Sequence, residues 1–166
     1  VNNELVMLSN ELLEKNIGVI GINSNDSSQE KYAEDSFGKM QEYALELGYK
    51  FPYVVDEDQK AAKEFTAQCT PDFFLFDNTQ SLIYRGQLDS SRPGNDQPVT
   101  GDSLRSAVEA MLSGQGPLPN QLPSAVAGDQ MNPTGIRTTT SFYQNALGGT
   151  TANSFNPLLI AADPLV

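Results

Sequence analysis

The sequence contains no histidine and only one cysteine among its 166 residues. Histidine is the commonest general base and a common metal ligand, so its absence excludes serine–histidine triads and histidine-based metal sites. A single cysteine cannot form an internal disulfide, and no Cys-x-x-Cys motif occurs anywhere in the chain. Nothing therefore indicates a secreted scaffold held together by disulfides, and no cofactor or metal is expected.

Basic residues are also scarce, with 10 Lys and Arg against 21 Asp and Glu and a net charge of −11. Such a surface repels phosphate backbones and offers no polybasic segment to an anionic membrane, so neither nucleic acid nor a membrane is an expected partner. No apolar run approaches the roughly 20 residues that a membrane-spanning helix needs. With 39 % hydrophobic residues, the length fits one domain with a modest core, plus an appendage.

The chain begins with Val1 rather than Met, and residues 1–16 already have the apolar spacing of a helix. A helix at the very start with no preceding cap suggests that upstream sequence is missing. No signal peptide is visible, which favours the cytoplasm. The compartment nevertheless stays open, because a targeting segment upstream of Val1 would not be seen, and the oligomeric state also stays open.

The periodicity of the apolar residues predicts alternating helices and strands. Helices are expected over 1–15, 36–47 and 102–112 and around 61–65, and strands over 17–22, 51–55, 73–76 and 82–84. In the helix over 102–112, Leu104, Val108, Met111 and Leu112 are expected to face inward. This order fits an α/β fold with a central mixed sheet flanked by helices.

The composition changes after Pro123, and residues 124–166 hold only three charged side chains. The segment is rich in Thr, Ser, Asn, Ala and Gly and has no sustained periodicity. The sequence therefore predicts a domain over 1–123 followed by an irregular, flexible tail over 124–166. Within the tail, Leu158 to Ile160 is the part suited to docking on the domain.

Four separated motifs carry a resemblance to a known family. They are GVIGINSND at 18–26, FPYVVDE at 51–57, CTPDFFLFD at 69–77 and YRGQLDSSRPGN at 84–95. Over about residues 1–123 the chain resembles thioredoxin-like proteins of the alkyl hydroperoxide reductase and thiol-antioxidant (peroxiredoxin-like) family. The resemblance implies a thioredoxin-like fold, truncated at its N-terminus by the strand that precedes the first helix. It also implies thiol, disulfide or peroxide partners, whereas the redox cysteines of the family match no residue of this chain.

The resemblance further implies a cis peptide bond at Pro71 and a substrate-binding role for Thr70 and Pro71. Cys69, two residues earlier, is the one candidate catalytic residue. No basic residue adjoins it, and free cysteines are commonly small buried hydrophobes, so a structural role is favoured over a reactive one.

The acidic residues Asp26, Glu30, Asp56, Glu57 and Asp58 lack the spacing and central glycine of an EF-hand. Solvated surface or helix caps are the favoured interpretation, with Asp56 or Asp58 capping the helix that follows. Arg85 and Arg92 are expected to pair with Asp89 or other carboxylates and to fix the loop over 87–100.

Three functional hypotheses follow. The first is a thiol–disulfide or peroxide oxidoreductase that is inactive as this chain alone, because the redox cysteine motif is absent. The second is a non-catalytic peptide-binding module of thioredoxin fold that holds an extended peptide at Thr70 and Pro71. The third is an incomplete reading frame with no independent function.

Overall fold

The computed structural model describes residues 2–28, 30–67, 69–92, 94–122, 124 and 158–162. Its helices are α1 (Asn2–Glu14), α2 (Phe37–Leu47), α3 (Lys60–Phe65) and α4 (Asp102–Leu112), together with a 3-10 helix η1 (Glu30–Asp35). The strands are β1 (Gly18–Asn23), β2 (Tyr53–Val55), β3 (Asp72–Phe76), β4 (Leu82–Gly86) and β5 (Leu158–Ala162). No described helix is both long and apolar enough to cross a membrane.

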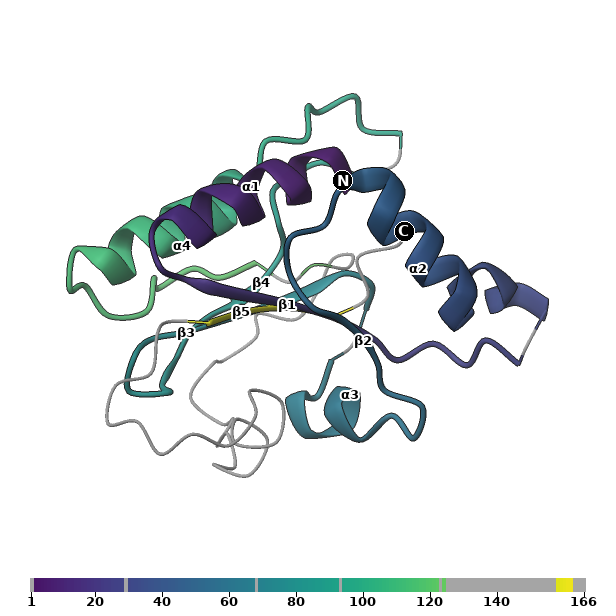
Figure 1. Cartoon of the computed structure of the whole chain (residues 1–166). Helices are drawn as coiled ribbons and strands as arrows, with labels where there is room; N and C mark the ends of the chain where they lie inside the picture. The colour runs from purple at the N-terminus through teal and green to yellow at the C-terminus, as the bar shows by residue number, and fades with distance from the viewer. Residues whose placement is uncertain are drawn as a thin grey trace.

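The five strands form one mixed sheet in the order β2-β1-β5-β3-β4. β1 runs parallel to β2 and β5, whereas β3 runs antiparallel to β4 and β5. Figure 1 shows α1 and α4 above the sheet and α3 below it. This arrangement confirms the predicted α/β fold with a central mixed sheet flanked by helices.

Alternation along the strands divides the core into two layers, because successive side chains of a strand point to opposite faces. Phe73 and Leu75 of β3 pack with Leu5, Leu8 and Leu12 of α1 and with Leu104 and Val108 of α4. Phe74 and Phe76 pack with Ala61 and Phe65 of α3 on the other face. All five residues of β3 are buried, as expected for a strand covered on both faces.

The C-terminal segment departs from expectation. Residues 124–166 were expected to have little regular structure, yet Leu158–Ala162 forms β5 at the centre of the sheet. The expected docking of Leu158 to Ile160 on the domain is confirmed. The expected lack of regular structure is wrong for Leu158–Ala162, because five consecutive uncharged apolar residues suit a fully buried strand. Residues 125–157 and 163–166 of the expected tail lie outside the described part of the chain.

A smaller correction concerns the helix predicted over 102–112. Leu112 was expected to face inward, but it is 51 % exposed, and the buried face of α4 instead includes Ala107 and Ala110. At the end of α2, Gly48 adopts φ of 70°, and its N–H contacts the carbonyl oxygens of Ala44 and Leu45.

Candidate functional site

A cavity of about 380 Å³ opens beside the C-terminal end of β1. Three segments line it: Ile22, Ser24 and Asn25 at the end of β1, Gln59, Ala62, Lys63, Thr66 and Ala67 around α3, and Cys69 and Thr70 before β3. Its size lies within the usual range for small-ligand sites, roughly 300–1,000 Å³. Two of the predicted site residues, Cys69 and Thr70, thus share one cavity, whereas Pro71 is not part of its lining.

The loop before β3 carries the predicted cis bond, since the Thr70–Pro71 peptide is cis. Cys69 is half-buried rather than fully buried, and its Sγ lies 4.0 Å from the carbonyl oxygen of Pro71. The expectation of a small buried hydrophobe is therefore too simple, because one side of Cys69 faces the open cavity.

Asp56 joins two walls of this cavity. Its carboxylate accepts hydrogen bonds from the backbone N–H of Ala61 and Ala62, both at 3.0 Å, which confirms the predicted capping of α3. The same carboxylate accepts a hydrogen bond of 2.8 Å from the Ser24 hydroxyl, and Gln59 Nε2 donates to the Ser24 carbonyl at 3.0 Å. The start of α3 is thereby fixed against the end of β1. The residues that the structure describes contain no group of three or more metal-ligating side chains.

Arg85 fixes the opposite end of α3. Its guanidinium donates to Thr66 Oγ1 at 2.9 Å and to the Thr66 carbonyl at 2.5 Å, and it forms an ion pair of 3.3 Å with Asp72. The guanidinium also lies 5.1 Å from the ring centroid of Phe74. The prediction that Arg85 pairs with a carboxylate is confirmed, and the carboxylate that the structure shows is Asp72 rather than Asp89.

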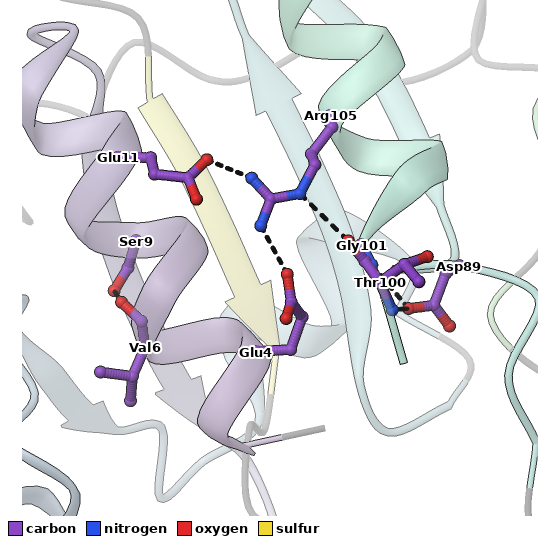
Figure 2. A network of polar contacts seen from close by, with 8 residues as sticks. All are labelled: Glu4, Val6, Ser9, Glu11, Asp89, Thr100, Gly101 and Arg105. Carbon is purple, nitrogen blue, oxygen red and sulfur yellow. Dashed lines mark hydrogen bonds and ion pairs between the residues drawn. The ribbon is translucent and has the colours of Figure 1, made fainter. Parts of the chain in front are cut away.

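Asp89 instead organises the long loop where it meets α4, on the other face of the sheet (Figure 2). Its carboxylate accepts hydrogen bonds from the backbone N–H groups of Thr100 and Gly101 at 2.7 Å and from Ser91. Burial alone would raise the pKa of Asp89, but these hydrogen bonds outweigh it and hold the pKa below its ordinary value. Arg92 donates to the carbonyl oxygens of Asp89 and Ser91, so the predicted role of this arginine in fixing the loop is confirmed.

The signals for this site were only partly visible in the sequence. The Cys69–Pro71 loop was found through a contiguous motif, whereas Ser24, Gln59 and Lys63 come from separate segments with no shared pattern. Asp56 was expected to cap the helix that follows, but its hydrogen bond to Ser24 at the end of β1 was not predicted.

Comparisons with known proteins agree with this geometry. The family model described as Redoxin matches residues 2–104. An uncharacterized conserved protein from Geobacillus kaustophilus is 49 % identical, with a TM-score of 0.70, over 74 % of this chain and 64 % of its own. A hypothetical protein from Sinorhizobium meliloti is 38 % identical, with a TM-score of 0.71, over 76 % of this chain and 72 % of its own.

None of the curated proteins compared with the chain matches it. The chain spans less than two thirds of the length of the Geobacillus protein. The family model matches more than half of the present chain. Fold, motif order and family match agree, and the chain belongs to the Redoxin family, the thioredoxin-fold lineage of peroxidases and thiol oxidoreductases.

Proposed function

We propose that this chain supplies the substrate-binding part of a thiol–disulfide or peroxide oxidoreductase site and completes no redox cycle by itself. The observation that carries the proposal is the cavity whose lining brings Cys69 and Thr70 together with Ser24 and Lys63. A cavity with one thiol, one ammonium group and several hydrogen-bonding groups suits an extended peptide segment or a small polar thiol compound.

The chemistry limits what one thiol achieves. If the Cys69 thiolate attacks a disulfide, one sulfur becomes bonded to Cys69 and the other leaves as a thiolate, and the mixed disulfide persists until a second thiol attacks it. With peroxide, the thiolate sulfur takes one oxygen to form a sulfenic acid while the peroxide is reduced to an alcohol or water. Two external thiols must then restore Cys69, releasing water and a disulfide. This chain has one cysteine, so turnover requires a thiol from outside it.

Turnover assays test the catalytic part of this proposal. The chain and its Cys69→Ser variant are compared for reduction of insulin disulfides by dithiothreitol and for consumption of hydrogen peroxide with dithiothreitol present. We expect both proteins to give the uncatalysed rate, and an aromatic disulfide to release at most one equivalent of thiolate per chain. Multiple turnovers that the Cys69→Ser variant lacks would show a complete one-cysteine enzyme instead.

Peptide binding tests the substrate-binding part. Lys63 lines the cavity, whereas Lys60, on the same helix, does not and has a mostly exposed side chain. We expect Lys63→Met to weaken the binding of a short extended peptide carrying a mixed disulfide by about tenfold, and Lys60→Met to leave it unchanged. Equal effects of the two substitutions would place the peptide outside the cavity.

The second candidate is a peptide-binding module with no redox role, which the polar groups of Ser24, Asn25 and Gln59 in the cavity wall favour. The two candidates are distinguished by comparing the affinity of the mixed-disulfide peptide with that of the same peptide carrying serine in place of its cysteine. Preference for the disulfide form supports the oxidoreductase site, and equal affinity supports the binding module.

A further inference from the structure

β5 occupies a slot between two strands that are otherwise not hydrogen-bonded neighbours. It pairs in parallel with β1, with Leu159 opposite Val19 and Ile160 opposite Ile20. On its other side it pairs antiparallel with β3. Among the described strands, β1 and β3 are joined only through β5, so the slot presents the backbone donors and acceptors of two strands at once.

The slot also requires apolar side chains on both faces of the strand that occupies it. Leu159 is fully buried in the layer beneath α1 and α4, and Ile160 is fully buried in the layer against α3. An occupant must therefore be extended and apolar on both faces, because alternate side chains enter the two layers. The uncharged sequence of β5, Leu-Leu-Ile-Ala-Ala, meets this requirement.

The occupant of the slot comes from far along the chain. The other strands lie between Gly18 and Gly86, whereas β5 begins at Leu158. Docking of β5 therefore closes a long loop, and the entropic cost of such a closure rises with loop length.

One end of the slot lies beside the cavity. Ala162, the last residue of β5, is in register with Ile22 of β1 and with Asp72 of β3. Ile22 lines the cavity on one side, and Asp72 follows directly after the loop that contributes Thr70 on the other. With strands about 4.8 Å apart, β5 holds the two sides roughly 10 Å from one another.

We propose that β1 and β3 form an acceptor slot for an extended apolar strand, which β5 fills from the far end of the chain, and that a peptide with the sequence of β5 also fills it in trans. Filling the slot assembles the cavity. This proposal goes beyond the redox role and does not depend on it.

The main experiment uses the full chain with Ile160→Asp, which places a carboxylate in an apolar layer and disables its own β5. A fluorescent peptide covering residues 156–163 is titrated against this variant. We expect saturable binding, at least tenfold weaker binding to the unmodified chain because its tethered β5 competes, and no binding of the same peptide carrying aspartate in place of Ile160. The peptide should also slow alkylation of Cys69 in the variant toward the rate of the unmodified chain.

A second pair of variants leaves the sheet intact. Ile160→Ala shortens a side chain of β5, and Val108→Ala shortens a buried side chain of α4 on the opposite face. We expect Ile160→Ala to raise the rate of Cys69 alkylation without denaturant at least tenfold over Val108→Ala. Equal rates in the two variants would show that the site opens only with global unfolding and would overturn the proposal. So would an Ile160→Asp chain that neither binds the peptide nor regains slow alkylation in its presence.

Discussion

The two faces of the sheet are built differently. On one face, α1 and α4 cover a large apolar cluster and are joined by the Arg105 guanidinium, which bonds Glu4 and Glu11 of α1 (Figure 2). On the other face, α3 has only six residues and packs on a smaller cluster beside the cavity. Space for a ligand is thus found on the more thinly covered face, and rigidity comes from the other, as is usual where a stable scaffold carries a binding site.

The largest expected effect is on the α3 face. Arg85→Met removes the guanidinium from the buried Asp72 and releases Thr66 at the end of α3. We expect a loss of about 3–5 kcal/mol in the free energy of unfolding, because breaking a buried ion pair leaves a desolvated charge behind. Urea denaturation measures this loss, and Cys69 alkylation should accelerate with it.

The control for this substitution is the double variant Arg85→Met with Asp72→Asn, which removes both charges. It should be more stable than Arg85→Met alone, since the carboxylate no longer has to be ionised in the interior. The losses in the free energy of unfolding of Arg85→Met alone and of Asp72→Asn alone are compared with the loss in the double variant. If the two single losses add up to the loss in the double variant, the pair is not energetically coupled.

A substitution that leaves a cavity in the core beneath α4 should lower the stability of the fold without changing the accessibility of Cys69. Leu104 is fully buried, and Leu104→Ala is expected to cost about 3 kcal/mol from lost burial and the space left behind. Leu112→Ala, on the same helix but exposed, should change stability by less than about 0.5 kcal/mol. Cys69 alkylation in native buffer should be unchanged in both, and an acceleration in Leu104→Ala would mean that the two faces are not independent.

A pH-dependent effect is expected at Asp89. Because its pKa is lowered on folding, the ionised carboxylate stabilises the fold above the unfolded pKa of about 3.9 and loses this contribution as the pH falls through the folded pKa. Asp89→Asn should therefore cost about 2 kcal/mol at pH 7, the typical contribution of hydrogen bonds to a charged group. Thermal unfolding at pH 7 and at pH 3 measures the difference between the two proteins. A difference of the same size at both values would assign the effect to side-chain shape rather than to charge.

The smallest effect is expected at the polar link between α1 and α4. Arg105 is partly exposed, so Arg105→Met should cost only about 1 kcal/mol, less in 1 M salt, where ion pairs are screened. Lys39→Met removes an exposed pair with Glu42 within α2 and should leave the melting temperature unchanged. A salt-independent loss in Arg105→Met would indicate that packing of its aliphatic part matters more than its charge.

Local patterns explain which parts of this fold could be predicted. The sequence was sufficient to predict α1 from the helical spacing of Leu5, Leu8 and Leu12. It was also sufficient to predict β3 and β4 from two apolar runs separated by a turn, because each of these elements buries side chains within a short stretch of chain. The docking of Leu158 to Ile160 was expected, but the place of β5 at the centre of the sheet was not, because a short apolar run carries no information about its distant partners. The cavity wall was only partly found, since Ser24 and Lys63 meet Cys69 through tertiary packing alone.

The outer edge of β4 has a consequence for association. Gln121 behaves like a peptide group of an added strand: its Oε1 accepts from the Arg85 N–H at 2.8 Å, and its Nε2 donates to the Ile83 carbonyl at 3.0 Å. The Leu122 carbonyl accepts from the Gln87 N–H, and it approaches so closely that a Cβ on Gly86 would lie 2.3 Å from it. The Gln121 side chain and the Leu122 carbonyl, for which Gly86 leaves room, thus occupy backbone groups of this edge with which a strand from another molecule would otherwise pair.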